Sequence, residues 1–250
     1  MKEQIEFKKF NNEVSSLAKL IGLHRSVYQN TFFKNRLIYF DVKYYDFLKK
    51  LVIDKYHFFY VIEVNSSIIG FAHLRLIDDF LFLNNISVSN EYSGRGLGSK
   101  LLSFSIQEAS KCIKNVSVLK LDVLRSNHRA FSWYKKLGFM EEKITTWYQF
   151  NGVFFKEKLN YSLKPCENGF SSLFFNTTKI ATIINNNLIL HDSNHIFYID
   201  LTQFQSAITN DDSFKTNFLF EGALLKFDTI DNSIRMSVKL KKIIKNLKNV

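Results

Sequence analysis

The sequence has few of the residues that cross-link or interrupt a fold. Its 250 residues include 2 Cys, 1 Pro and 9 Gly. Two cysteines exclude a disulfide framework, and Cys112 and Cys166 are not spaced like metal ligands. There is no run of roughly 18 apolar residues, so no membrane span is expected. Acidic residues stand near Met1 where a secretory signal needs an apolar stretch. We therefore expect a cytoplasmic protein.

The single proline marks the predicted domain boundary. A chain of this length commonly forms one or two domains. Pro165 lies with Gly169 in a short segment of turn-forming residues, the strongest interruption in the sequence. We predict one domain over residues 1–162 and a second over residues 166–250.

Aromatic residues and positive charge are abundant. The chain has 26 Phe, 11 Tyr and a formal net charge of +11. A basic surface can attract nucleic acid or another polyanion, or it can simply keep an aromatic-rich chain soluble. The lysines are scattered rather than clustered with aromatic residues, so we favour the second interpretation and expect neither a nucleic-acid nor a membrane partner.

The first part of the chain alternates between helical and strand patterns. Apolar residues at spacings of three and four predict helices, and β-rich apolar runs bounded by turn residues predict strands. The expected helices cover residues 12–30, 42–52, 96–113 and 127–137, and the expected strands 57–64, 68–76, 80–88, 116–124, 144–150 and 153–161. This order predicts a mixed α/β domain with antiparallel hairpins and at least one strand–helix–strand crossover.

The last third has a different pattern. Short apolar runs alternate with Asn- and Asp-rich turns, which predicts a small, mostly β domain. The runs cover residues 171–175, 180–184, 188–190, 196–201, 218–220 and 224–227. We find no convincing internal repeat in the sequence. Residues 235–248 suit a basic amphipathic helix, which we expect to be a solvated C-terminal helix.

A glycine-rich segment after the third strand carries the first chemical signal. The strand ends at Val88, and Ser93-Gly94-Arg95-Gly96-Leu97-Gly98 precedes a helix that begins near Ser99. Glycines let the backbone approach a phosphate, and the free N–H groups at a helix start bind anions. Arg95 can add charge to a bound pyrophosphate.

Two familiar phosphate loops do not fit this segment. A Walker A loop needs Gly directly before Lys and then Ser or Thr, whereas Ser99 precedes Lys100 and Leu101 follows it. A dinucleotide-binding fingerprint needs the spacing G-x-G-x-x-G, whereas the spacing from Gly94 is G-x-G-x-G. A glycine-rich turn without a ligand remains the alternative at this point.

A second motif follows the next predicted strand. Residues 127–139 read Asn-His-Arg-Ala-Phe-Ser-Trp-Tyr-Lys-Lys-Leu-Gly-Phe. With the glycine loop, this segment resembles the GNAT superfamily of N-acetyltransferases. That pattern is a strand, a loop [R/Q]-x-x-G-x-[G/A], a helix, a strand and then N-x-x-A-x-x-x-Y-x-x-x-G-F. The resemblance implies an α+β fold, a mainly antiparallel sheet flanked by helices, over about residues 10–160.

The resemblance also implies a co-substrate, acetyl-CoA, and residues that would bind it. Backbone groups of Ile86 and Val88 would pair with the pantetheine arm as an added strand does. The backbone amides from Gly94 to Ser99 would hold the pyrophosphate, and Asn127 would contact the CoA arm. Asn is also a good helix N-cap, and both roles are compatible. The expected cofactor-binding set is therefore Ile86, Val88, Ser93, Gly94, Arg95, Gly96, Leu97, Gly98, Ser99 and Asn127.

The expected catalytic residue is Tyr134, which in the resembling pattern protonates the leaving thiolate. Its alternative is an aromatic core position on an amphipathic helix. The resemblance implies no general base in this chain, because Phe82 stands where some family members have a Glu that acts as the base. Other candidate bases are Glu63, His73, Asp78, Asp79 and Asp122, and we single out none of them. The family usually has Arg or Gln where this chain has Ser93, so we expect Arg95 to compensate.

The expected function is transfer of an acetyl group from acetyl-CoA to a primary amine of a small molecule, an amino sugar or a peptide. Two alternatives remain open: a GNAT-like module that binds CoA or an acyl-CoA without turnover, and an RNA-associated acetyltransferase. The sequence leaves the role of the C-terminal domain undecided and is compatible with a homodimer.

Overall fold

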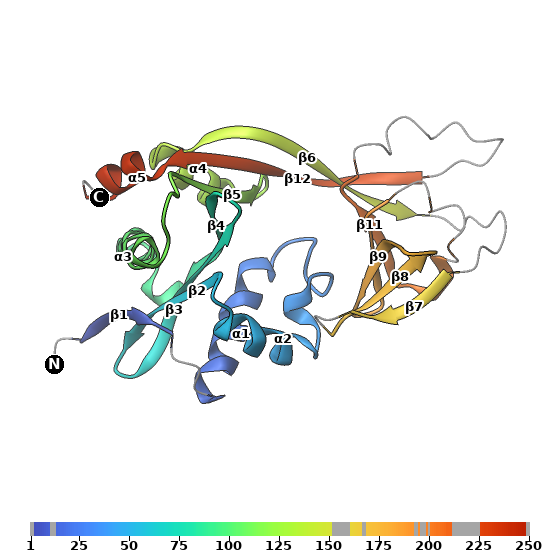
Figure 1. Cartoon of the computed structure of the whole chain (residues 1–250), viewed down its shortest axis with the longest axis horizontal. Coiled ribbons are helices and arrows are strands. Elements are labelled where there is room, and N and C mark those ends of the chain that lie inside the picture. Colours follow the sequence, from blue (N-terminus) through green and yellow to red (C-terminus); the bar gives the residue numbers. More distant parts are fainter. Residues whose placement is uncertain are drawn as a thin grey trace. The chain divides into compact units, whose positions relative to one another are not determined.

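The computed structural model describes residues 3–10, 14–151, 161–166, 169–192, 195, 199, 201–211 and 226–248. The chain forms two compact units (Figure 1). Unit 1 comprises residues 1–31, 45–143 and 234–250, and unit 2 comprises residues 32–44 and 144–233. Two long strands, β6 and β12, begin in one unit and end in the other.

Unit 1 has the mixed architecture expected from the sequence. Its helices are α1 (Val14–Tyr28), α2 (Tyr44–Ile53), α3 (Leu97–Cys112), α4 (His128–Lys136) and α5 (Leu240–Leu247). Its strands are β1 (Ile5–Lys9), β2 (His57–Val64), β3 (Ser67–Ile77), β4 (Phe80–Val88), β5 (Val118–Leu124) and the ends of β6 (Met140–Asn151) and β12 (Lys226–Lys239) that belong to this unit. The strand order is β1-β2-β3-β4-β5-β12-β6.

The pairing of β4 with β5 decides where a site can form. Strands β1 to β4 pair antiparallel, whereas β4 and β5 are parallel. The parallel pairing covers only Leu81–Leu83 against Leu119–Leu121. Beyond Leu83, β4 continues to Val88 paired with β3. The last residues of β4 thus lie beside β3 on one edge and leave the other edge open.

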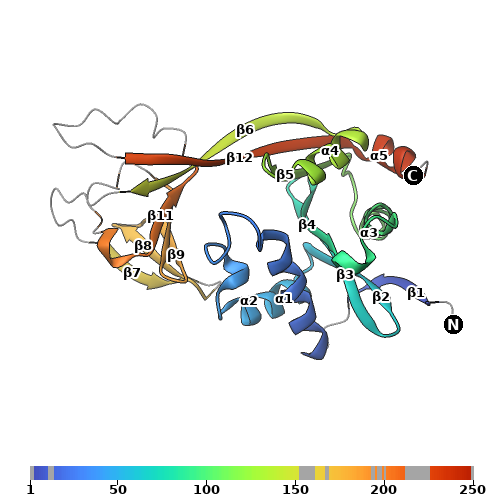
Figure 2. The ribbon, with the colours of Figure 1, turned by 180° about the vertical axis from the view of Figure 1, so that it is seen from behind.

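Helices cover both faces of the unit 1 sheet (Figures 1 and 2). On one face, Leu101 and Ile106 of α3 pack with Ala72, Leu74 and other alternate residues of the strands in a single core. On the opposite face, His24 of α1 lies against Phe71 of β3, with ring centroids 4.2 Å apart. The period of two along β3 explains this division, because successive side chains point to opposite faces.

The C-terminal segment differs from the prediction. Residues 235–239 continue strand β12, and the helix begins only at Leu240. The helix is not fully solvated as we expected, because Leu240, Ile243 and Leu247 are buried in the unit 1 core. The side chain of Asn246 donates a hydrogen bond of 2.9 Å to the carbonyl of Leu137 at the end of α4. The prediction of a solvated helix rested on the lysines, which form only the exposed face of α5; its apolar residues form the buried face.

Unit 2 is mostly β, as predicted. Its strands are β7 (Tyr161–Pro165), β8 (Ser171–Phe175), β9 (Thr178–Ile184), β10 (Asn187–Leu190) and β11 (Ser206–Thr209), followed by parts of β6 and β12. The order is β7-β8-β9-β10-β11-β6. Its core includes Ile180, Ala181, Leu188 and Leu190, all fully buried. Strands β1, β7 and β11 were not predicted, because each is short and polar residues interrupt it.

The compact units do not coincide with the predicted domains 1–162 and 166–250. Residues 234–250 pack in unit 1, and residues 32–44 pack in unit 2. The boundary at Pro165 stays a prediction, since Glu167 and Asn168 beside it lie outside the described residues. The strand predicted over 153–161 and the run 218–220 also lie outside them, apart from Tyr161.

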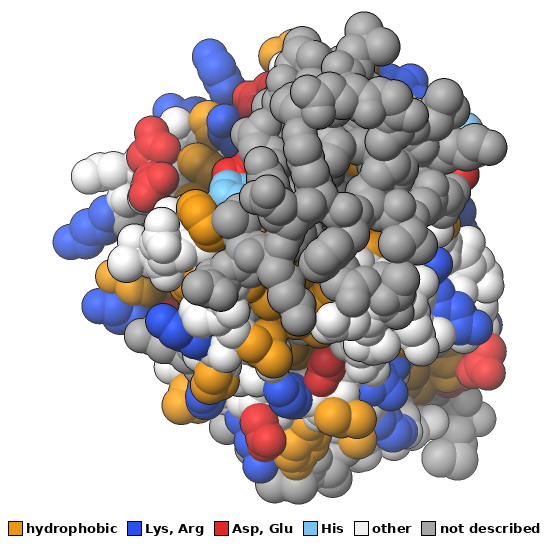
Figure 3. Space-filling view, turned by 90° about the vertical axis from the view of Figure 1, so that its right-hand side faces the viewer, with side chains coloured by type: hydrophobic (Ala, Val, Ile, Leu, Met, Phe, Trp, Pro, Cys, Tyr) orange, Lys and Arg blue, Asp and Glu red, His pale blue; other side chains and the backbone are white. Residues whose placement is uncertain are grey.

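The surface side chains carry charge of both signs. On the face shown in Figure 3, described Lys and Arg side chains are scattered among acidic, polar and apolar ones. In the described part of the chain, no helix is long and apolar enough to cross a membrane.

Candidate active site

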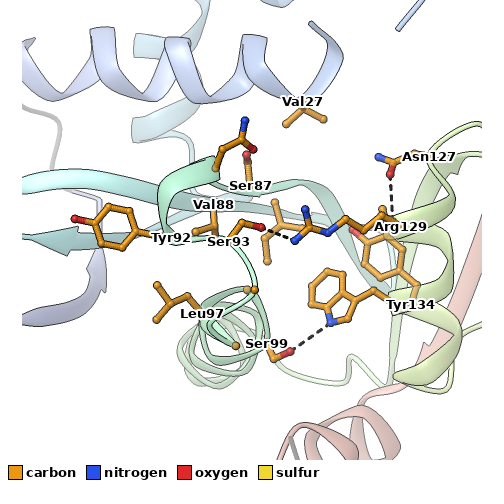
Figure 4. Close-up of a pocket in the computed structure, with 17 residues that line it drawn as sticks. Val27, Ser87, Val88, Tyr92, Ser93, Leu97, Ser99, Asn127, Arg129 and Tyr134 are labelled. Atoms are coloured by element: carbon orange, nitrogen blue, oxygen red, sulfur yellow. Dashed lines mark hydrogen bonds between the residues drawn. The ribbon is translucent and has the colours of Figure 1, made fainter. Parts of the chain in front are cut away.

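Unit 1 contains a cavity of about 430 Å³ at the open end of β4 (Figure 4). Every residue that we predicted to bind cofactor or to act in catalysis lines it, except Arg95. The lining residues that we did not predict are Val27, Ser87, Asn90, Tyr92, Arg129, Ala130 and Trp133. The end of a strand, a glycine loop and residues of three helices, α1, α3 and α4, therefore meet at one place.

The glycine loop has the conformation that a phosphate site needs. Gly94 and Gly96 have φ of +79° and +73°, a region that favours glycine over other residues. Gly96 is the residue before α3, and its carbonyl accepts the hydrogen bond of Lys100. The amides of Leu97, Gly98 and Ser99 precede the first intrahelical donor. Such amides and the helix dipole favour a bound anion.

The backbone of β4 supplies a second set of polar groups. Ser89 donates its amide to the carbonyl of Ile69 on β3 at 2.7 Å. Because facing groups alternate along an antiparallel strand, the amides and carbonyls of Val88 and Ile86 point away from β3. This is the edge that β5 leaves open beyond Leu83. An extended ligand chain can pair there as an added strand does.

Arg129 takes the position that we expected for Arg95. Arg129 lines the cavity, and its guanidinium donates to the hydroxyl of Ser93 (Figure 4). Arg95 instead donates to the carbonyl of Glu91 at 3.1 Å and lies 3.5 Å from the carboxylate of Glu3. Arg95 thus does not line the cavity, and the expected compensation for Ser93 by Arg95 stays a prediction. The sequence signal for Arg129 was its place in the first turn of α4.

Trp133 joins the two helices of the cavity. Its indole N–H donates to the hydroxyl of Ser99 on α3 at 3.3 Å. The indole also lies 3.9 Å from the position that a Cβ at Gly98 would take. The start of α3 and the side chain of Trp133 on α4 are thus in contact at the cavity.

Asn127 is the N-cap of α4. Its side-chain oxygen accepts a hydrogen bond from the amide of Ala130 at 3.1 Å. The capping role expected from the sequence is present, since a cap oxygen satisfies one of the free amides of the first turn. Asn127 also lines the cavity, so the same side chain stands beside any ligand there.

Tyr134 is buried at the cavity and keeps its proton. The side chain is 7% exposed, and its ring lies 5.4 Å from that of Phe139 and 4.9 Å from that of Trp133. Burial raises the pKa of its phenol well above the ordinary value, because the phenolate would lose its hydration. A phenol that stays protonated can donate a hydrogen bond or a proton to a ligand.

None of the five candidate bases lines the cavity. The carboxylate of Glu63 pairs with Lys8 at 2.7 Å, and that of Asp122 pairs with Arg235. His73 is buried, with its Nε2 atom 2.8 Å from Nδ1 of His57. Asp78 has φ of +48° in the turn after β3, and Asp79 completes that turn. Among the described residues, no group of three or more potential ligands is placed to hold a metal ion.

The fold and the cavity are those of an α/β protein in which a strand end, a glycine loop and a helix start present polar backbone groups to one cavity. Residues 24–139, a little less than half of the chain, match the family described as the acetyltransferase (GNAT) family. This segment is therefore similar to a family that uses acetyl-CoA as its acetyl donor.

Two relatives whose names state an activity are similar to part of this chain. The [ribosomal protein bS18]-alanine N-acetyltransferase of Escherichia coli K12 is 38% identical over 80 residues, which are 32% of this chain and 53% of that protein. An N-alpha-acetyltransferase of Sulfurisphaera tokodaii is 32% identical over 106 residues, which are 38% of this chain and 63% of that protein. The chain thus spans between half and two thirds of these relatives.

One solved structure shares the fold over nearly the whole chain. A tandem GNAT protein from the clavulanic acid biosynthesis pathway, solved without acetyl-CoA, has a TM-score of 0.63 and 12% sequence identity. The similarity covers 94% of this chain and 98% of that protein. The two relatives above cover 32% and 38% of this chain, whereas this similarity in fold covers 94% of it.

Proposed function

We propose that the chain is an N-acetyltransferase that binds acetyl-CoA in the unit 1 cavity. The observation that carries the proposal is that the open edge of β4, the glycine loop, the start of α3 and Tyr134 line one cavity. The amides from Gly94 to Ser99 and the guanidinium of Arg129 hold the pyrophosphate. The pantetheine arm pairs with Ile86 and Val88.

Acetyl transfer at this site is a direct attack in a ternary complex. The nitrogen of the acceptor amine forms a bond to the thioester carbonyl carbon, and the carbon–sulfur bond then breaks. The amide of Val88 donates to the carbonyl oxygen as negative charge develops. The phenol of Tyr134 gives its proton to the departing thiolate, and the proton lost by the amine replaces it through solvent.

The acceptor that fits best is an α-amine at a peptide N-terminus. No candidate base lines the cavity, so the amine must arrive neutral or lose its proton to water. At pH 7.5 about a third of α-amines are neutral, against about 0.1% of lysine side chains, because their ordinary pKa values are about 7.8 and 10.4. The named activities of the two relatives, both on α-amines, support the same acceptor.

A peptide panel tests the acceptor. One peptide carries a free α-amine and a lysine, and a second has the α-amine blocked. We expect acetylation of the first peptide at its N-terminus, located by mass spectrometry, and none of the second. Acetylation of the lysine alone would refute the α-amine as acceptor.

The variant Tyr134→Phe tests whether Tyr134 is the general acid. We expect turnover to fall by about 10²-fold while the dissociation constant of acetyl-CoA stays the same. The matched control is Tyr60→Phe, because Tyr60 is also buried with a raised pKa but lies outside the cavity. Equal turnover in the Tyr134 variant and the parent chain would remove Tyr134 from the mechanism.

Arg129→Ala tests the phosphate contact. We expect the dissociation constant of acetyl-CoA to rise by about 10- to 100-fold, since a hydrogen bond to a charged group contributes about 1.5–3 kcal/mol. Arg95→Ala, outside the cavity, should change it by less than about threefold, as a solvent-exposed ion pair does. The opposite ranking would restore Arg95 as the binding residue.

The alternative that binds acetyl-CoA without turnover rests on the same cavity and on the absence of a candidate base from its lining. It would be supported if acetyl-CoA binds and no amine of the panel is acetylated. The RNA-associated alternative, the homodimer and the exclusion of nucleic acid stay predictions from the sequence.

A further inference from the structure

Unit 2 repeats the strand pairing of unit 1 residue for residue. Strands β2 and β3 pair Tyr60 with Ala72, continue to Ile62 with Gly70, and then shift so that Val64 faces Ser67. Strands β8 and β9 pair Ser171 with Ile183, continue to Leu173 with Ala181, shift at the same step and end with Phe175 facing Thr178. Each pair in the second hairpin is the first plus 111, including the irregularity.

The neighbouring strands follow the same register. Five consecutive pairs join β1 to the last five residues of β2, from Ile5 with Val64 onward. Five consecutive pairs likewise join β7 to β8, from Tyr161 with Phe175 onward. The turns between the paired hairpin strands also correspond, because Asn65 and Asn176 both have positive φ.

The correspondence extends to the strand that forms the acetyl-CoA site in unit 1. Gly70 faces Val88 on β4, and its counterpart Ala181 faces Leu190 on β10. Leu190 therefore stands where Val88 stands. By the same count Leu188 stands where Ile86 stands, and both units place a buried Asn before it, Asn85 in one and Asn187 in the other.

The fifth strands of the two units differ in whether they pair with these equivalent positions. In unit 1, β5 leaves β4 after Leu83, and Ile86 and Val88 line the cavity. In unit 2, β11 pairs with β10 along its whole length, up to Leu190 facing Thr209. The hydroxyl of Thr209 donates to the carbonyl of Leu190 at 3.0 Å, and both side chains are fully buried. The edge that would bind pantetheine is already occupied.

The connection after the fourth strand differs as well. In unit 1 it holds the glycine loop and α3 (Leu97–Cys112). In unit 2 only residues 191–205 join β10 to β11, and this segment contains no glycine. Glycine is the residue that adopts positive φ at the lowest cost, so this segment lacks the residue type that forms the loop at Gly94 and Gly96.

The strands β6 and β12 are exchanged between the two repeats of the chain. β6 follows α4 at the end of the first repeat, yet its later residues pair with β11 of the second repeat, as Phe150 faces Ala207. β12 comes at the end of the second repeat, yet it is the neighbour of β5 in the first. Through β12 and α5, the second half supplies Ile234, Met236 and Ile243 to the core under the cavity.

We infer that unit 2 is a second copy of the GNAT strand framework whose cofactor site is closed by β11. The chain then binds one acetyl-CoA, in unit 1, and the second copy completes unit 1 with its last strand and helix. That acetyl-CoA is the ligand rests on the proposed function, whereas the closure of the β10 edge does not depend on the proposed function.

Amide hydrogen exchange without ligand tests the closure directly. We expect the amides of Leu188 and Leu190 to exchange far more slowly than those of Ile86 and Val88, because only the former lie on a paired edge. Equal, fast exchange at all four amides would overturn the closure even in a protein that binds no acetyl-CoA.

Titration calorimetry and amide hydrogen exchange in the presence of acetyl-CoA test how many molecules bind to each chain. We expect one molecule per chain and slowed exchange at Ile86 and Val88, with Leu188 and Leu190 unchanged. Two molecules per chain, or ligand-dependent slowing at residues 187–190, would contradict the inference. No binding at all would refute the proposed function, and the ligand-free comparison would still decide the closure.

Discussion

The two units have the same strand pairing over their first four strands and differ at one edge. In unit 1 the fifth strand leaves the fourth after three pairs, and in unit 2 it stays paired to the end. The first arrangement exposes backbone groups at Ile86 and Val88. The second satisfies the equivalent groups within the protein. The comparison indicates that the unit 1 cavity forms where strand pairing stops.

The units also differ in what surrounds that edge. Unit 1 places α1 and α2 between its first and second strands, whereas residues 166–170 alone join β7 to β8. Unit 1 follows its fourth strand with a glycine loop and a helix, and unit 2 follows it with a shorter glycine-free segment. The shared framework provides the sheet, and the inserted segments contribute to the lining of the unit 1 cavity.

The largest expected effect comes from removing residues 226–250. Unit 1 would lose Ile234, Met236, Val238, Leu240, Ile243 and Leu247, all buried in its core. Burying each apolar side chain contributes about 1.5–3 kcal/mol, and a typical domain has a stability of only about 5–15 kcal/mol. We expect the shortened chain to show no cooperative unfolding by circular dichroism and to bind no acetyl-CoA.

Point variants in the intact chain separate this effect from simple truncation. Ile243→Lys places a charge in the unit 1 core and should unfold the protein, whereas Lys245→Ser changes an exposed position of the same helix and should not. A folded 1–225 chain that binds acetyl-CoA would show that unit 1 does not need the second half.

An intermediate effect comes from lowering the pH. His24 and His73 of unit 1 are buried, and burial lowers the pKa of His24 to about 3 and that of His73 well below its usual range. The unfolded chain therefore binds more protons below pH 6.5, so stability is full above this pH and falls as the pH drops towards 3. We expect a loss of about 2 kcal/mol per histidine at pH 5, measured by denaturant unfolding.

Matched substitutions assign this pH dependence to unit 1. His24→Gln should reduce the slope of stability against pH by about one proton. His191→Gln in unit 2 should reduce it less, because the side chain of His191 is exposed. The same reduction in both variants, or none in the first, would contradict the assignment to the buried histidines.

The smallest expected effect concerns two buried hydroxyls, that of Thr209 on β11 and that of Ser99 on α3. Thr209→Val removes the hydrogen bond to Leu190 in unit 2 and should lower stability by about 1 kcal/mol without changing acetyl-CoA affinity. Ser99→Ala removes the acceptor of Trp133 in the unit 1 cavity, so we expect a similar change in stability together with weaker binding. A change in affinity from Thr209→Val would place a ligand in unit 2.

The sequence predicted most residues that line the unit 1 cavity, because short local segments build it. The glycine loop and residues of the motif at Asn127–Phe139 line one cavity. Arg129 was missed because the direction of a side chain on a helix depends on the neighbouring loop. Arg95 does not line the cavity for the same reason, since it turns to Glu91 and Glu3. The roles of these residues stay predictions.

The sequence predicted long-range pairing poorly. The repeat was missed because it lies in strand register, with only the segments after Asn65 and Asn176 similar in sequence. The C-terminal strand and the burial of one face of the predicted C-terminal helix were missed, because that face belongs to a core formed by residues much earlier in the chain. Local patterns cannot show which core such a face joins.

The most direct test is thermal unfolding with and without acetyl-CoA for the intact chain, Gly96→Asp and Gly169→Asp. Both glycines have positive φ, +73° and +87°, but only Gly96 lines the cavity. We expect the parent chain and Gly169→Asp to gain about 2.7 kcal/mol at a ligand concentration ~100 times the dissociation constant, which raises the midpoint by about 5–10 °C. Gly96→Asp should show no shift. A shift that survives in Gly96→Asp, or no shift in the folded parent chain, would contradict a cofactor site in unit 1.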